Sequence, residues 1–253
     1  MHFLDNLEYI TITYHQNIEK FKNLPFYFNN YKFLNIKKNN RQENIIIFTS
    51  EVQLKKLEKA SQILMDATFL CCPKKFYQLF NIIAVIGENH FLFPIIHVLM
   101  THKSSYSYEK IFNNINEIVK EMDIKFSFNK AHIMSSFEHP LLKAIKKIYP
   151  KCILEGCYFH YSKTLWSKSK KLGLVNKKYI KIIRFIILGY KMHPFLKEDD
   201  KNNFLSSIDK FIENYKNLIK FSKYFHSNLG GSNFINFNSI EDKKILYRTN
   251  NYK

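Results

Sequence analysis

The sequence predicts an α/β protein in which a mixed five-stranded sheet is followed by an all-helical region. Three strand-like apolar runs come in succession, at residues 62–69, 76–87 and 91–100. A helix, a strand, a helix and a strand then alternate up to His160, after which the apolar period becomes helical. The resulting order, β-β-β-α-β-α-β, is that of a ribonuclease H-like core.

The first strands are bounded by local signals. Ser50 and Gln53 have the spacing of a capping box, which predicts a helix with Leu54 and Leu57 on its buried side. Pro94 has no amide hydrogen to donate to a neighbouring strand. The strand that contains it should therefore lie at an edge of the sheet or carry a bulge.

The clearest helix of the core begins near Tyr108. Its apolar residues follow an i, i+3, i+4 series: Ile111, Phe112, Ile115, Ile118, Val119 and Met122. A fourth strand is expected at 130–136, and Pro140 fits the first position of the next helix. A fifth strand follows at 152–159.

Beyond the fifth strand, the sequence predicts only helices. A helix through Leu165 and Trp166 should end at Gly173, because glycine readily adopts the left-handed conformation that closes a helix. Two more helices are expected, at 179–190 and 204–225. The final core helix of a ribonuclease H-like fold is missing from this pattern.

These elements divide the chain into four parts. Residues 1–60 form an N-terminal region of uncertain structure that ends in a helix, with a strand expected at 45–48. Residues 61–160 form the core, residues 161–228 form a helical insertion, and residues 229–253 form a loop-like tail.

The chain is strongly basic. It has 39 Lys and Arg residues against 21 Asp and Glu residues, a formal net charge of +18, which predicts attraction to a polyanion. Basic side chains are dense after the fifth strand, where they would line a phosphate track with Tyr161 and Trp166 nearby for stacking, or form a solvated lysine-rich face. Because lysine dominates, we expect non-specific, salt-sensitive contact with DNA. The candidate nucleic-acid-binding residues are Lys163, Lys168, Lys170, Lys171, Lys177, Lys178, Lys181 and Arg184.

The four cysteines are too few for a disulfide scaffold in a chain of 253 residues, and no targeting tract is evident. The most apolar runs, 80–87 and 91–100, are too short to span a bilayer. We therefore expect an intracellular protein with no membrane segment.

One carboxylate interrupts the first core strand. Asp66 follows the apolar residues Ile63, Leu64 and Met65, a pattern typical of a strand covered on both faces. Burying an ionised carboxylate is costly unless a cation or strong hydrogen-bond donors meet it. Either Asp66 binds a divalent metal, or it lies at the exposed end of the strand and accepts a bond from a backbone amide.

Several motifs of the sequence, in order, resemble the Mutator-like element (MULE) transposases, particularly the animal type allied to FLYWCH zinc-finger proteins. The resemblance is dense over residues 45–175 and is carried by "QILMDATF", "CPKKFYQLFNI", "SSFEHPLLKAIKKIYP", "EGCYFHYSKTLWSKSKKLGL" and "RTNN". It implies DNA cleavage and strand transfer by an Asp-Asp-Glu triad with Mg²⁺ or Mn²⁺, and a nuclear location. Two such cations sit about 4 Å apart and clamp the attacking and leaving oxygens of a phosphodiester.

Carried over residue by residue, the resemblance places the first acid at Asp66, although the family usually has glycine in place of Ala67. The second acid belongs to a family "DFE" motif that reads "SFE" here, so its position is Ser136. Glu138, two residues later, is a weak candidate to substitute for it. The family's third acid follows shortly after "RTNN", and the chain stops at Lys253, so this alignment contains no third acid.

The segment "CYFH" matches a Cys-x-x-His element of the family. Cys157 and His160 have a spacing that suits two ligands of a zinc ion. A tetrahedral site needs more partners, and Cys71 and Cys72 are candidates only by elimination. The alternative is a buried thiol and a histidine at the start of the next helix.

The sequence therefore predicts a protein derived from a MULE transposase that is catalytically impaired and has residual affinity for DNA. A second hypothesis is a host module that binds nucleic acid or protein and is built on the transposase fold. A third is an active metal-dependent transposase, if the sequence is a truncation whose continuation supplies the third acid.

Overall fold

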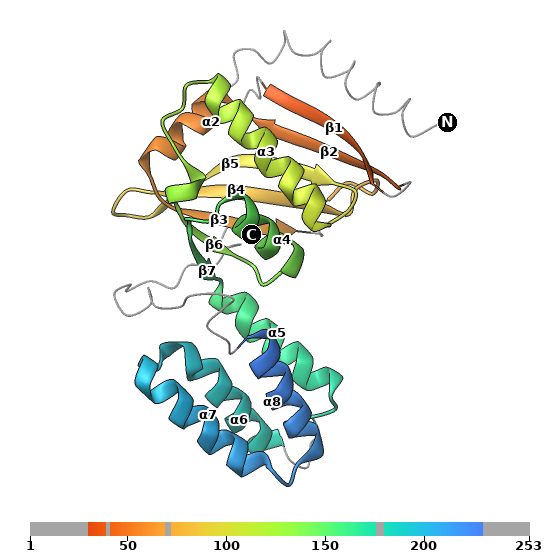
Figure 1. Ribbon diagram of the computed structural model, residues 1–253, viewed down its shortest axis with the longest axis vertical. Helices are drawn as coiled ribbons and strands as arrows, with labels where there is room; N and C mark the ends of the chain where they lie inside the picture. The colour runs from red at the N-terminus through yellow and green to blue at the C-terminus, as the bar shows by residue number, and fades with distance from the viewer. Residues whose placement is uncertain (1–29, 39–40, 69–71, 176–179, 230–253) are drawn as a thin grey trace.

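The computed structural model describes residues 30–38, 41–68, 72–175 and 180–229 (Figure 1). Within these residues the chain forms a mixed sheet with helices packed on it, followed by a group of four helices. The expected α/β architecture is thus confirmed. The predicted tail at 229–253 lies almost entirely outside the described residues.

The sheet has seven strands in the order β1-β2-β5-β4-β3-β6-β7. Pairing is parallel between β3 and β6 and between β6 and β7, and antiparallel elsewhere. The strands are β1 (Asn30–Lys38), β2 (Arg41–Thr49), β3 (Ala60–Thr68), β4 (Gln78–Ile86), β5 (Phe91–Met100), β6 (His132–Ser135) and β7 (Ile153–Gly156).

The prediction of five strands was therefore too low. The five expected strands are present as β3 to β7, and a hairpin of β1 and β2 extends the sheet beyond β5. Most of this hairpin falls in residues 1–45, whose mixture of aromatic and polar residues shows no clear alternation. Only the apolar end of β2 at 45–48, which pairs with β5, had been expected.

One face of the sheet carries the main core. Figure 1 shows α3 (Ser105–Glu121) and α4 (His139–Ile148) lying across this face. The amphipathic series of α3 is buried as predicted, and it packs with strand residues such as Phe80 and Ile82. A smaller cluster of Leu64, Ile83 and Val85 forms a separate group.

The predicted helix cap at Ser50 and the predicted irregularity at Pro94 are both present in the structure. The side chain of Ser50 accepts a hydrogen bond from the Gln53 amide, which caps α2 (Glu51–Lys55). Pro94 lies beside a register shift between β4 and β5, so the predicted bulge is confirmed. The 3₁₀ turns are η1 (Lys56–Lys59), η2 (Phe128–Lys130) and η3 (His193–Phe195).

The four later helices pack around their own core of Leu165, Ile187, Phe221 and Phe225. They are α5 (Tyr158–Lys171), α6 (Ile180–Met192), α7 (Glu198–Ile212) and α8 (Lys216–Asn228). Gly173 has φ +66° directly after α5, as predicted for its left-handed cap. In the part of the chain that the structure describes, no helix has the length and apolar character needed to cross a membrane.

The prediction of one helix over 204–225 was wrong. The chain leaves the helical conformation at Tyr215 and returns as α8, so the two helices form a hairpin. Asp209 on α7 holds the hairpin, because its carboxylate accepts hydrogen bonds from Ser222 at 2.5 Å and from His226 at 2.9 Å. No glycine or proline marks the turn, so the apolar period runs through it without a visible break.

Candidate functional site

Asp66 is a buried carboxylate near the end of β3. Asp66 is only 3 % exposed, so it does not lie at an exposed end of the strand, which was the alternative to a metal ligand. Asp66 pairs with Asn81 on β4, and Asn81 pairs with His97 on β5. The Asn81 Oδ1 and His97 Nδ1 atoms lie 2.7 Å apart. Alternation along β3 places this polar row on the same face as Leu64.

Ser136 lies beside Asp66 at the same end of the sheet. Strand β6 runs parallel to β3 and pairs Ser135 with Met65, and the Ser136 amide donates to the Met65 carbonyl at 3.4 Å. Ser136 is 8 % exposed. The two positions that the family resemblance assigns to the first and second acids are therefore adjacent, and the second position holds the hydroxyl of Ser136.

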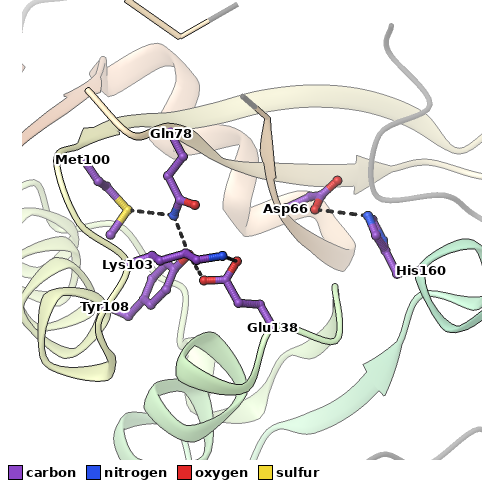
Figure 2. A network of polar contacts seen from close by, with 7 residues as sticks. All are labelled: Asp66, Gln78, Met100, Lys103, Tyr108, Glu138 and His160. Atoms are coloured by element: carbon purple, nitrogen blue, oxygen red, sulfur yellow. Dashed lines mark hydrogen bonds and ion pairs between the residues drawn. The ribbon is translucent and has the colours of Figure 1, made fainter. Parts of the chain in front are cut away.

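Glu138 does not continue the strand, because it occupies the N-cap position of α4. Figure 2 shows its carboxylate close to the side chains of Lys103 and Tyr108. The Tyr108 hydroxyl donates to Glu138 Oε1 at 3.1 Å, and Lys103 Nζ lies 3.7 Å from Oε2. The same Tyr108 oxygen accepts a hydrogen bond of 2.6 Å from Gln78 Nε2.

Burial dominates the electrostatics of Glu138. It raises the pKa of this carboxyl, the charge of Asp66 raises it further, and Lys103 and Tyr108 lower it, with a net rise. Burial also raises the pKa of Tyr108 well above its usual range. Tyr108 is therefore a neutral hydrogen-bond donor at this site.

His160, in the first turn of α5, faces Asp66. Its Nε2 atom lies 3.6 Å from Asp66 Oδ1, as Figure 2 shows. Burial lowers the pKa of this imidazole, but a hydrogen bond with Cys157 and the charge of Asp66 raise it, and the net effect is a rise. When it is protonated, His160 places a cation beside the buried carboxylate.

These groups open into one pocket of about 710 Å³ between the end of the sheet and the later helices. Asp66, Ser136, Glu138 and His160 all line it, so the structure brings together four candidates that are far apart in the sequence. The other lining residues include four cations, and they are Ala67, Thr68, Lys103, Phe137, Lys163, Thr164, Ser167, Lys168, Lys171 and Tyr224.

The described residues that line this pocket supply few carboxylate ligands for a pair of cations. Among the described lining residues only Asp66 and Glu138 carry carboxylates, and Asp66 faces His160 while Glu138 faces Lys103. Among the described residues, no cluster of three or more His, Cys, Asp or Glu side chains is arranged to hold a metal ion. The hydroxyl of Ser136 adds no negative charge, and hard divalent cations are held mainly by charged oxygens.

The same finding bears on the predicted zinc site. Cys157 and His160 are close enough to share a hydrogen bond, but the described residues add no third ligand to them. Cys71 lies outside the described residues. Cys157 is buried at the N-cap of α5, and His160 lies in the first turn of that helix.

The candidate nucleic-acid-binding residues lie in different surroundings on α5 and α6. Lys163, Lys168 and Lys171 line the Asp66 pocket, and Lys168 Nζ lies 4.4 Å from the centre of the Tyr224 ring. Lys170 points over the Trp166 ring at 5.8 Å. The remaining described candidates, Lys181 and Arg184, are exposed on α6, whereas Lys177 and Lys178 lie outside the described residues.

Tyr161 cannot stack on a nucleic-acid base, contrary to the prediction. It is fully buried, and its hydroxyl donates to the Tyr190 carbonyl at 2.5 Å. Burial raises the pKa of Tyr161 above its usual range. The residue belongs to the core of the helical part, where its ring packs beside Phe137 and Tyr158.

Three residues of the site carry no signal that sequence reasoning could have used. Lys103 stands in the short loop before α3, where a lysine is ordinary in so basic a chain. Tyr108 marks the start of the apolar series of α3 in the sequence, and nothing near it in the sequence indicates a partner for its hydroxyl. Gln78 at the start of β4 lies 30 residues from Tyr108, and only the folded chain brings the two together.

Comparison with known families adds one finding. Residues 62–164 match the family described as the MULE transposase domain. None of the curated proteins matches the chain. The match covers β3 through the first half of α5, so it includes Asp66, Ser136, Glu138 and His160.

Proposed function

We propose that this chain derives from a MULE transposase, whose ancestral role is DNA cleavage and strand transfer in transposition, and that it binds DNA without cutting it. The observation that carries the proposal is the pocket in which Asp66 lies beside Ser136 among several lysines. The match of residues 62–164 to the MULE transposase domain supports the derivation. The strand order supports the finer assignment of a ribonuclease H-like core. The sequence motifs, rather than the fold, favour a relative of the FLYWCH-allied elements.

The charge of the pocket supports the loss of cutting. Two-metal cleavage of a phosphodiester needs several carboxylates to hold Mg²⁺ or Mn²⁺. Here Ser136 is neutral, Glu138 is held by Tyr108 and Lys103, and Asp66 faces His160. Both carboxylates thus face basic side chains of the protein, and four lysines give the described lining of the pocket a net positive charge.

The same lining supports DNA as the partner. Helix α5 contributes three lysines to the lining of the pocket, Lys163, Lys168 and Lys171. Because α5 has no acidic residue, its own side chains would not repel a phosphate bound there. Lysine contacts a phosphate as a point charge and reads no base. The binding is therefore non-specific, which is consistent with an intracellular, nuclear protein that keeps its ancestor's affinity for DNA.

A salt titration tests this proposal. Binding of a labelled duplex is followed by fluorescence anisotropy while the salt concentration rises. The logarithm of affinity should fall linearly with the logarithm of salt concentration, with a slope that reports the number of phosphates contacted. Affinity that does not weaken with salt, or no binding at low salt, would contradict the proposal.

A further inference from the structure

A second pocket lies between α5 and α6, apart from the Asp66 pocket. Its volume is about 600 Å³, within the range of roughly 300–1,000 Å³ found for small-molecule sites. Phe159, Lys163 and Trp166 contribute from α5, and Arg184, Leu188 and Lys191 contribute from α6. None of the described residues that line it is acidic.

This lining combines aromatic and apolar side chains with cationic ones. Trp166 and Phe159 offer aromatic rings, and Leu188, which is 53 % exposed, offers an apolar wall. Arg184 and Lys191 place cations beside them. An apolar slot with a cationic rim suits a flat aromatic group that carries a negative charge.

We propose that the α5–α6 pocket binds an unpaired nucleotide of single-stranded DNA, with its base on Trp166 and its phosphate at Arg184 and Lys191. The inference rests on the proposed function, which makes DNA the partner of this chain. A paired base stays stacked within the duplex and cannot enter a pocket, whereas an unpaired base exposes its π-face to an aromatic side chain. A nucleotide thus uses both the rings and the cations.

The position of Lys163 supports a continuous path for one strand. This residue lines both the α5–α6 pocket and the Asp66 pocket. A strand whose base occupies the first pocket can pass Lys163 and place its next phosphates near Lys168 and Lys171. The exposed side chain of Phe185, next to Arg184 on α6, offers a further ring outside the pocket.

The chain carries its own reporter of this site, because Trp166 is its only tryptophan. The intact chain is titrated with a short oligothymidylate, with a duplex of the same length and with polyglutamate, and tryptophan emission is recorded. Anisotropy of labelled copies of both DNA probes measures affinity independently of emission. Oligothymidylate should quench Trp166 emission to saturation, and the duplex and polyglutamate should quench it far less at equal charge.

Variants separate base stacking from general electrostatics. Trp166→Ala should weaken oligothymidylate binding roughly fivefold or more, as removal of a stacking platform does, and should leave duplex binding nearly unchanged. Trp166→Phe keeps a ring in the helical core and should lose less affinity, which guards against a folding defect. Arg184→Gln should weaken oligothymidylate more than duplex, whereas the matched control Lys181→Gln, on the same helix outside the pocket, should weaken both equally.

Three results would overturn the inference. Emission of Trp166 that is unaffected while oligothymidylate binds would show that the strand lies elsewhere. Equal quenching by the duplex would show that the pocket responds only to phosphates, and equal quenching by polyglutamate would favour an acidic protein as the partner. If the chain bound neither form of DNA, the proposed function itself would fail, an outcome distinct from binding with a silent tryptophan.

Discussion

The hydroxyl of Tyr108 offers a sharp test of how Glu138 is held in the pocket. Tyr108 is fully buried, and its oxygen accepts from Gln78 and donates to Glu138. Tyr108→Phe removes both bonds and keeps the ring contact with Phe80, whose centroid is 5.2 Å away. The substitution therefore isolates the polar network from the packing.

The magnitude follows from the two bonds. A neutral hydrogen bond contributes about 0.5–1.5 kcal/mol net, and a bond to a charged group contributes about 1.5–3 kcal/mol. The Glu138 side chain is 16 % exposed, and Gln78 keeps its contact with the Met100 sulfur, so the lower end applies. We expect Tyr108→Phe to lower the free energy of unfolding by about 2 kcal/mol near neutral pH.

The loss should also depend on pH. The Tyr108 bond lowers the pKa of Glu138, so its removal raises the folded-state pKa further above the unfolded value. A carboxyl with a raised folded pKa loses stability as pH rises through that pKa, since the folded state then binds the proton more tightly than the unfolded state. The deficit of the variant should therefore be smaller at about pH 4 than at about pH 8.

Urea denaturation at the two pH values measures this difference. Tyr149→Phe is the matched control, because the Tyr149 hydroxyl is also buried but its partners, Asn116 Oδ1 at 3.1 Å and the Phe112 carbonyl at 3.4 Å, carry no charge. Its loss should be the same at both pH values. A Tyr108→Phe deficit below about 0.5 kcal/mol, or one that does not change with pH, would refute the reasoning.

Three further predictions concern the site and its helices. Ser136→Asp alone should confer no metal-dependent nicking, and nicking by this single variant would show that our account of the missing ligands is wrong. Lys168→Gln should weaken duplex binding and reduce the salt slope by about one, and an unchanged slope would place Lys168 off the phosphate track. Gly173→Ala should lower stability by about 1 kcal/mol in urea denaturation, because Gly173 has φ +66°, and Gly173→Asn should cost less. Equal stability of all three proteins would contradict this role for Gly173.

Local signals explain which parts of the fold the sequence predicted. The Ser50 cap, the apolar series of α3 and the end of α5 at Gly173 each depend on residues a few positions apart. The β1–β2 hairpin and the turn at Tyr215 carry no such signal. Each is fixed by contacts between segments, such as the bonds of Asp209 to α8.

The site shows the same division. The meeting of Asp66 with Ser136 followed from strand order, because parallel neighbours end at the same edge of a sheet. The contacts of Glu138 with Tyr108 and Lys103 depend on how side chains point after the chain has folded. No spacing in the sequence could have indicated them.

The most direct test of the proposed function is a nicking assay that records binding in the same sample. The intact chain is incubated with linear DNA bearing terminal repeats, with and without Mg²⁺ or Mn²⁺, beside Asp66→Ala. We predict that the DNA is bound but remains uncut under every metal condition, for both proteins. Metal-dependent nicking by the intact chain that disappears in Asp66→Ala would contradict the central claim, because it would show that Asp66 still serves a working catalytic centre.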